Sequence, residues 1–423
     1  MVLSRPNLFK NNVEFIIIVF VFIIIILFRL TILYQEYQEF ISKPFYYTDA
    51  IVLKQYNKIK NGKSYVVLKL KTTDEYNIYT TSYIKKNITL HKIRIKILIN
   101  RKITFFSYLN SFYSPVIIKK IYKKVKDRRD YFLTKIQNQH KNSDIIDFYQ
   151  AIFLAKSINQ SLRKSVSLLG VSHLIALSGF HLSILWGIIF TLLSYIYKPL
   201  QQRYFPYRYN LIDLGFISLV FLALYVWFVG YPPSLIRSFV MLLSIWTLSI
   251  LGMNLVSFQF LLTIVLLILS INPLLIASIS FWYSIAGVFY IYLILEWSKE
   301  RSSLVISLVY IPFGIFIMML PIVHLFFNYT SIWQLLSPIL SILFIPFYPL
   351  SIFLHLINIG YIFDEVLLSL FALPRTYFES NLSVNFGILY IITNIASIWS
   401  RFIFIFNILL AFIYALYLFW RLF

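Results

Sequence analysis

Residues 13–34, VEFIIIVFVFIIIILFRLTILY, decide the class of this fold. The run is about 22 residues long, and about 18 to 20 consecutive apolar residues are enough to span a bilayer. A cleaved signal peptide has a shorter apolar core followed by a small-residue cleavage site, and no such site follows this run. We therefore predict a retained N-terminal transmembrane helix within residues 1–40, with Arg29 near its end.

The rest of the chain has the same apolar character. Of its 423 residues, 60% are hydrophobic and only 13% are charged, a balance that excludes a soluble globular protein. Further apolar runs near spanning length lie at 173–197, 211–231, 234–252, 255–271, 273–295, 303–327, 331–358 and 402–420, with another candidate at 384–399. We predict a polytopic α-helical membrane protein with about 9–10 transmembrane helices. The chain has no cysteine, which excludes disulfides and thiolate metal sites.

The formal net charge of +22 is concentrated in one soluble region. Residues 43–141 contain 23 Lys and Arg against 5 Asp and Glu. Within this region IRIKILI (93–99) alternates apolar and basic residues, as a half-buried strand does, and the Asn61-Gly62 pair suits a hairpin turn. We predict a small β-rich domain over residues 41–110, folded as a barrel or a sheet.

Basic and aromatic residues alternate along this β-rich region. Single-stranded nucleic acid binds to cationic grooves that offer aromatic stacking surfaces, so the region could bind DNA. The tyrosines also suit the core and surface of a barrel without any ligand. The candidate DNA-binding residues are Lys69, Lys71, Lys92, Arg94, Lys96, Tyr76 and Tyr79.

Residues 117–136, IIKKIYKKVKDRRDYFLTKI, place apolar residues at helical spacing with Lys and Arg between them. The pattern predicts a basic amphipathic helix, and we expect residues 111–170 as a whole to form basic amphipathic or interfacial helices. Such helices suit an anionic lipid surface or a polyanionic ligand, and the two are compatible. Residues 361–373 are also expected at the interface, because they contain Asp364 and Glu365.

The stretch GVSHLIALSGFHLS (170–183) is polar for its place at the head of a long apolar region. His173 and His181 flank a Ser178-Gly179 pair that could interrupt the helix. Interrupted backbone at membrane depth is tolerated only beside protein or water, so the stretch suggests a water-lined path. The histidines could equally be packing groups that bond a neighbouring carbonyl.

Catalysis by this stretch finds less support in the sequence. Ser178 with His181 as its base could form a hydrolase site, but LSGFH is not the GxSxG nucleophile elbow. Two histidines could bind a metal, but no HExxH motif or acidic cluster supplies a third ligand. We therefore expect no catalytic residue, no metal and no cofactor.

A second polar cluster lies at 232–241, PPSLIRSFVM. The Pro-Pro pair starts a helix, and Arg237 follows about one turn later. A guanidinium this close to a helix end could reach the interface, or it could face a pore and attract phosphate.

Together these clusters resemble the ComEC family of competence proteins, which form inner-membrane channels for imported DNA. The family pattern Gly-x-Ser-His-Leu-x-Ala-x-Ser-Gly-x-His is matched by Gly170, Ser172, His173, Leu174, Ala176, Ser178, Gly179 and His181. Later family elements are similar to Ser234, Arg237, Ser238 and Met241, to Pro273 and the FWYSIAGV segment with Ser284, and to the segment from Pro321 to Pro346. The resemblance covers roughly 145–350, and more loosely the β-rich region.

The chain departs from the family pattern at several places. Ser341 stands where the family has an Asn, and Lys156-Ser157 stands where it has Gly-Asp. Longer members end in a metallo-β-lactamase-like domain with a His-x-His-x-Asp-His motif, which nothing here matches. We therefore expect a short form of the family, and no strand-degrading nuclease activity is carried over.

The resemblance implies a channel domain over residues 171–423 and an OB-like fold for the β-rich domain. It implies translocation of single-stranded DNA across the inner membrane during natural transformation, along a path that includes His173, Ser178, Gly179, His181, Ser234, Arg237, Ser284 and Ser341. The expected partners are single-stranded DNA, membrane lipid, a periplasmic DNA receptor and a cytoplasmic ATP-driven helicase or translocase, since the chain has no phosphate-binding loop of its own. The β-rich domain is expected outside the cytoplasm. The alternatives are an intramembrane enzyme and a transporter of a small anion.

Overall fold

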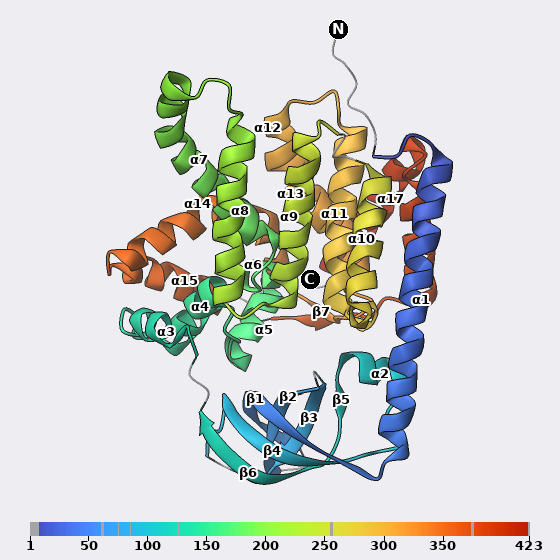
Figure 1. The fold of residues 1–423 in the computed structure, drawn as a ribbon, viewed down its shortest axis with the longest axis vertical. Helices are drawn as coiled ribbons and strands as arrows, with labels where there is room; N and C mark the ends of the chain where they lie inside the picture. The colour runs from blue at the N-terminus through green and yellow to red at the C-terminus, as the bar shows by residue number, and fades with distance from the viewer. Residues whose placement is uncertain are drawn as a thin grey trace. The chain divides into compact units, whose positions relative to one another are not determined.

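The computed structural model describes residues 8–60, 63–74, 76–84, 86–124, 127–253, 257–373 and 376–421. The chain divides into two compact units. One contains residues 9–127 and 262–282, and the other contains most of 128–261 and 283–423. Each unit is described by itself, and Figure 1 shows the elements of both.

The first unit contains a six-stranded sheet in the order β5-β3-β2-β1-β4-β6. Its strands are β1 (Phe45–Lys60), β2 (Lys63–Thr72), β3 (Asn77–Ser82), β4 (His91–Leu98), β5 (Phe112–Tyr113) and β6 (Val116–Lys124). β1 and β2 pair antiparallel as far as Lys60 and Lys63, as a hairpin requires. The predicted turn residues, Asn61 and Gly62, lie outside the described residues.

The sheet closes on itself because its two end strands are neighbours in the chain. Only Ser114 and Pro115 separate β5, which pairs parallel with β3, from β6, which pairs antiparallel with β4. At the junction Ser114 N–H donates to the Tyr79 carbonyl, and Leu98 N–H donates to the Pro115 carbonyl. One bent segment thus completes a small barrel, which removes the free edges that an open sheet would expose.

Helix α1 (Asn12–Ser42) contributes to the core of this barrel. At 1.5 Å per residue, 31 residues extend about 46 Å, longer than the roughly 30 Å hydrocarbon core. Its last turns bring Phe40, which is 4% exposed, against the barrel residues Tyr76 and Phe112. The spanning helix and the β-rich domain are therefore joined without a linker.

Two further segments belong to the first unit. Helix α2 (Phe105–Asn110) packs against α1 through Phe105 and Tyr108. Arg29 of α1 donates to the carbonyls of Ser270 and Ile271, at 3.1 and 2.8 Å, where helix α10 (Phe258–Ile271) ends. A cation at the C-terminal carbonyls of a helix complements its dipole.

The prediction of one basic helix over 117–136 is wrong. Residues 116–124 form strand β6, and only Asp130–Gln137 is helical, as α3. β6 pairs with β4 through Ile118 opposite Ile95 and Ile121 opposite Ile93, with a register shift between the two pairs. Because a bulge adds one residue to the alternation, residues three apart face the same side and imitate helical spacing. The boundary predicted at residue 110 accordingly moves to residue 127.

The second unit is helical. Its long helices are α7 (Gly179–Tyr204), α8 (Asn210–Phe228), α9 (Pro233–Ile250), α11 (Ile279–Trp297), α13 (Ile311–Val323), α14 (Ser337–Leu356), α16 (Val384–Ala396) and α17 (Arg401–Trp420). Eight helical segments of the described chain are long and apolar enough to cross a membrane: α1, α7, α8, α9, α11, α17 and the two segments Ser303–Val323 and Ile332–Leu356, which end with α13 and α14. Of the remaining apolar helices, α10 and α16 are shorter. This arrangement confirms the predicted polytopic membrane fold with a β-rich domain after the first helix.

The chain just before α14 and the chain after α15 lie side by side. Strand β7 (Tyr329–Thr330) pairs with β8 (Phe378–Glu379), which joins the chain just before α14 to the chain after α15 (Asp364–Ala372). The nine residues of α15 extend about 14 Å, which is too short to recross a bilayer. The predicted span over 331–358 corresponds to Ile332–Leu356, which is long and apolar enough to cross a membrane.

Short helices precede the membrane part. They are α4 (Ser143–Leu154), α5 (Gln160–Leu168) and α6 (Ser172–Ile175). α4 packs against α14 through its buried Phe148, Tyr149 and Phe153. This cluster forms the largest hydrophobic core among the described residues of the second unit.

Candidate functional site

The barrel presents one outer face that is both cationic and aromatic. Strand register places Lys69 opposite Tyr79, Lys71 opposite Ile51, Arg94 opposite Asp49 and Lys96 opposite Tyr47. Residues 48, 50 and 52 alternate with these and point into the core, where they are almost fully buried. The structure thus brings together on one face six predicted DNA-binding residues: Lys69, Lys71, Lys92, Arg94, Lys96 and Tyr79.

Cations on this face lie over aromatic rings. Lys96 Nζ is 3.8 Å from the centre of the Phe45 ring and 5.6 Å from that of Tyr47, and Lys69 Nζ is 5.6 Å from that of Tyr79. Such contacts hold the long lysine side chains beside flat surfaces on which bases can stack. Sequence reasoning missed Phe45, although its alternation with Tyr47 along β1 could have identified it.

Tyr76 does not belong to this face. Its ring packs against Phe40 and Tyr108, and its hydroxyl accepts a hydrogen bond from Tyr108 at 3.0 Å. Burial raises the pKa of the Tyr76 hydroxyl, as expected for a phenol in a hydrophobic core. Tyr76 stands just before β3, so it does not follow the alternation that turns Tyr79 outward. It packs against the barrel core and does not join the face predicted to bind DNA.

The polar stretch 170–183 is a helix break in the second unit. Gly170 has a φ of +69°, which suits glycine, and it ends the turn after α5. α6 then stops at Ile175, and α7 starts at Gly179 with Ser178 as its N-cap. The predicted interruption of the helix is therefore present between residues 175 and 179.

Helix α9 packs directly against the break. Ser234 Oγ donates to the Leu177 carbonyl at 2.6 Å and so satisfies backbone left free by the interruption. A Cβ at Gly179 would lie 2.9 Å from Ser238 Oγ, so only glycine allows this approach of α7 to α9. The predicted residues Gly179 and Ser234 are thus brought together.

Helix α14 covers another side of the break. Ser337 Oγ donates to the Gly170 carbonyl at 2.9 Å, and Ser341 Oγ donates to the Ser337 carbonyl at 2.7 Å. Because the Ser341 hydroxyl donates its hydrogen there, His173 Nε2, at 3.1 Å, is the donor to Ser341 Oγ. The His173 side chain keeps exposed surface.

His181 has a different environment from His173. It is fully buried, and its ring meets Phe344 and Tyr348 edge to face. Its Nδ1 accepts from the Ser178 backbone N–H at 3.3 Å, which completes a capping box at the start of α7. Ser178 Oγ lies 3.2 Å from the same nitrogen, but the ring is already fixed as a cap. His181 is accordingly a packing residue of the break.

The remaining predicted path residues are dispersed. Arg237 is 8% exposed on α9, so its guanidinium lies within the helical unit and not in solvent. Ser284 lies exposed on α11, and none of the described contacts joins it to the break. Within the described residues, no group of three or more His, Asp or Glu is arranged to hold a metal ion.

Comparison with known proteins places the helical unit in a family. The family model described as Competence protein matches residues 155–422. A curated relative, Recombination protein 2 of Haemophilus influenzae, is 27% identical over 201 residues, which cover 43% of this chain and 25% of that protein. The match thus spans a quarter of the relative's length. No solved structure matches the chain, and the barrel lies outside the family match.

Proposed function

The chain belongs to the competence protein family, and from this premise we propose that it carries single-stranded DNA across the cytoplasmic membrane during natural transformation. The main support for this proposal is the cationic and aromatic outer face of the barrel. A surface that combines Lys69, Lys96 and Arg94 with exposed rings provides phosphate contacts and stacking together, which is how single strands are bound without sequence preference.

The helix break supports a path through the membrane part. His173, which is exposed, and Ser341, which is half-buried, lie beside interrupted backbone, and such backbone occurs at membrane depth beside water or protein. We assign no catalytic role to Ser178, because its neighbour His181 is buried and occupied as a helix cap. The enzyme alternative would need an accessible base at this position.

The loop charges support an orientation. Three hydrogen bonds identify helix ends and loops that lie together at one end of the helices. Tyr197 donates to Asp213, and Trp246 Nε1 donates to the Leu211 carbonyl. Trp297 Nε1 donates to the Ser397 carbonyl. The basic residues of the loops at this end are Lys198, Arg203, Arg208, Lys299, Arg301 and Arg401.

The opposite loops differ in charge. The short connections at 229–232 and 325–331 have no Lys or Arg. Because short cytoplasmic loops carry the excess of Lys and Arg, the basic end faces the cytoplasm. The barrel and α3 to α6 precede α7 with no span between them, so they lie outside the cytoplasm. DNA would then meet the barrel before it meets the membrane part.

This orientation agrees with partners on both sides. A DNA receptor outside would deliver the strand to the barrel face, and an ATP-driven helicase or translocase inside would supply the energy. The chain itself has no phosphate-binding loop for that purpose.

Binding by the full chain in lipid nanodiscs tests the role of the barrel face. We expect the double variant Lys69→Ala/Lys96→Ala to weaken binding of a fluorescent single-stranded oligonucleotide. The slope of log affinity against log salt should fall by about 0.7 for each lysine–phosphate pair that the substitutions remove. Lys102→Ala is the matched control, because this exposed lysine of the same domain follows β4 and lies outside the face.

Transformation separates binding from transport. In a competent host whose own gene is replaced by these variants, the double variant should accumulate DNA outside the cytoplasm and yield few transformants. The control variant should transform normally. Equal salt slopes for both variants, together with normal transformation, would refute the assignment of the face.

A further inference from the structure

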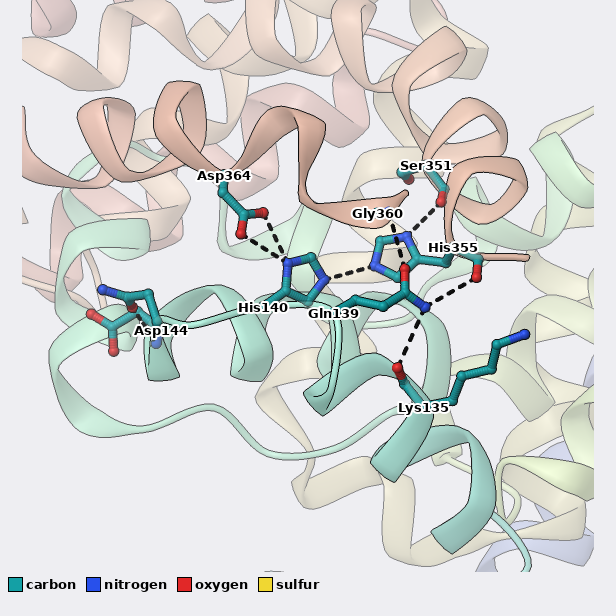
Figure 2. Close-up of polar contacts among 9 residues, drawn as sticks. Lys135, Gln139, His140, Asp144, Ser351, His355, Gly360 and Asp364 are labelled. Atoms are coloured by element: carbon teal, nitrogen blue, oxygen red, sulfur yellow. Dashed lines mark hydrogen bonds and ion pairs between the residues drawn. The ribbon is translucent and has the colours of Figure 1, made fainter. Parts of the chain in front are cut away.

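A chain of hydrogen bonds links the turn between α14 and α15 to the connection between α3 and α4 in the second unit (Figure 2). The Asp364 carboxylate lies 2.9 and 3.0 Å from His140 Nδ1. His140 Nε2 lies 2.9 Å from His355 Nε2, and His355 Nδ1 lies 2.6 Å from the Ser351 carbonyl. Both imidazoles are buried at 6% exposure, whereas the Asp364 side chain is 19% exposed and reaches solvent.

The number of protons in this chain is fixed by its three hydrogen bonds. Each bond contains one hydrogen, and the Ser351 carbonyl can only accept. Three protons are therefore distributed over Asp364, His140 and His355. An ionised carboxylate and two neutral imidazoles together hold only two of these three protons. The third proton lies between the two Nε2 atoms, and its positive charge balances the carboxylate, so the buried group has no net charge.

The other groups around the site leave this count unchanged. From α4, the Tyr149 ring stacks on His140 at 4.7 Å, and burial raises the pKa of its hydroxyl, so it stays neutral. Asp144 of α4 accepts from Asn159 at 2.5 Å. Lys135 of α3 donates to the Leu356 carbonyl at 3.4 Å and not to an imidazole. Glu365 and Lys141, which follow Asp364 and His140 in the sequence, have exposed side chains.

The site joins two segments that are distant in sequence. His140 lies between α3 and α4, whereas His355 and Asp364 flank the turn that joins α14 to α15. Gln139 binds the same turn, because its Nε2 donates to the His355 carbonyl at 3.1 Å and its Oε1 accepts from Gly360 N–H at 3.0 Å. Without the shared proton, two lone pairs would face each other at 2.9 Å; with a further proton, two N–H groups would.

We propose that Asp364, His140 and His355 form a site that binds one proton between the two imidazoles, and that this proton holds the α14–α15 turn against the α3–α4 connection. The turn belongs to the same segment that covers the helix break through Ser337 and Ser341. Protonation therefore controls how firmly the α14–α15 segment is attached. The proposal stands on the hydrogen bonds alone and does not depend on the transport of DNA.

The isosteric variant Asp364→Asn tests the proton count. An amide can still accept from His140, but the shared proton then leaves a buried positive charge without a counter-ion. We expect the full-length variant in detergent to unfold at a lower temperature than the wild type, and the difference to grow as the pH falls from about 8 toward about 5. The reason is that the wild-type site, with its counter-ion, binds the proton more tightly than the variant and so gains more stability in acid. Histidine-selective ¹⁵N spectra should show one shared proton in the wild type and its loss in the variant at the higher pH.

His324→Gln is the matched control. His324 is also buried, but its Nδ1 donates to the Leu320 carbonyl and its Nε2 accepts from Thr330 Oγ1, so a neutral ring satisfies both bonds. Because a neutral ring makes both bonds, acid adds no stabilising proton at this position, so the loss of stability in His324→Gln should not grow as the pH falls. If the difference between wild type and Asp364→Asn is also independent of pH, or if the spectra show two neutral rings in the wild type, the proposal is wrong.

Discussion

Asp49 is an acidic residue on the cationic face of the barrel. Its carboxylate lies 3.1 Å from Lys92 Nζ and 3.1 Å from Arg94 Nη1. Hydrogen bonds from Lys92 and then Arg94 lower the pKa of Asp49 below its usual range, so it is ionised at neutral pH. If the face binds DNA as proposed, an anion at this position would compete with a phosphate for the same two cations.

We expect Asp49→Asn to strengthen binding of single-stranded DNA. The substitution frees Lys92 and Arg94 and removes one negative charge, and an exposed pair of this kind corresponds to about a two- to five-fold change in affinity. Fluorescence anisotropy with the full chain at neutral pH measures it. Unchanged or weaker binding would show that the carboxylate orients the cations and does not compete with phosphate.

The same residue predicts a dependence of stability on pH. Because the folded-state pKa of Asp49 is lowered, its contribution is present above the unfolded pKa of about 4 and is lost as the pH falls through the folded value. The stability difference between wild type and Asp49→Asn should thus disappear in acid.

The direction in which a side chain faces could be predicted from the sequence only where the alternation along a strand decides it. Tyr79 and Lys69 follow the alternation of their strands, and their face was predictable. Tyr76 lies outside the strand, and its packing against Phe40 depends on a helix that the alternation does not describe. His140 and Asp364 are 224 positions apart, so no local pattern links them.

At the scale of elements, helices were easier to predict than the last strand. Long apolar runs must form helices in a bilayer, because their backbone has no other hydrogen-bond partners there. β6 was misread because its bulge places Ile118 and Ile121 on one side of the strand. The pairing of β7 with β8, which brings the chain after α15 beside the chain before α14, could not be predicted for another reason. A ladder of only two residues on each strand has almost no sequence signature.

The approach of α7 to α9 depends on one small residue. We expect Gly179→Ala to destabilise the protein by about 1 to 3 kcal/mol, because the new methyl group overlaps the Ser238 side chain, which must shift away from it. Thermal unfolding in detergent measures the loss, and transformation should fall with it.

The double variant Gly179→Ala/Ser238→Gly is the control for that prediction. Removing the Ser238 side chain opens the space that the methyl group needs, so most of the lost stability should return. A double variant no more stable than Gly179→Ala would mean that the glycine is required for another reason.

At the scale of the whole molecule, the absence of cysteine allows the orientation to be measured directly. We expect a single cysteine at Lys102, in the barrel domain, to react with a membrane-impermeant maleimide in intact cells. A single cysteine at Arg203, at the end of α7, should react only after the cells are permeabilised. The expected difference follows from the basic loops at the Arg203 end.

Reversed labelling of these two positions would place the barrel in the cytoplasm. The proposed direction of DNA entry would then be wrong, although the cationic face could still bind a strand. A cysteine at Tyr195 of α7, which is exposed on the apolar surface, controls for the reach of the reagent into lipid.

The unbroken course of α1 into the barrel core has a mechanical consequence. A domain on a flexible tether explores a large volume, and its effective concentration at any point falls with the length of the tether. Here Phe40 of α1 is itself part of the barrel core, so no flexible tether separates the barrel from the helix. Under the proposed function, a strand bound to the face of Lys69 and Lys96 would therefore move with α1, and each tilt of that helix would shift it.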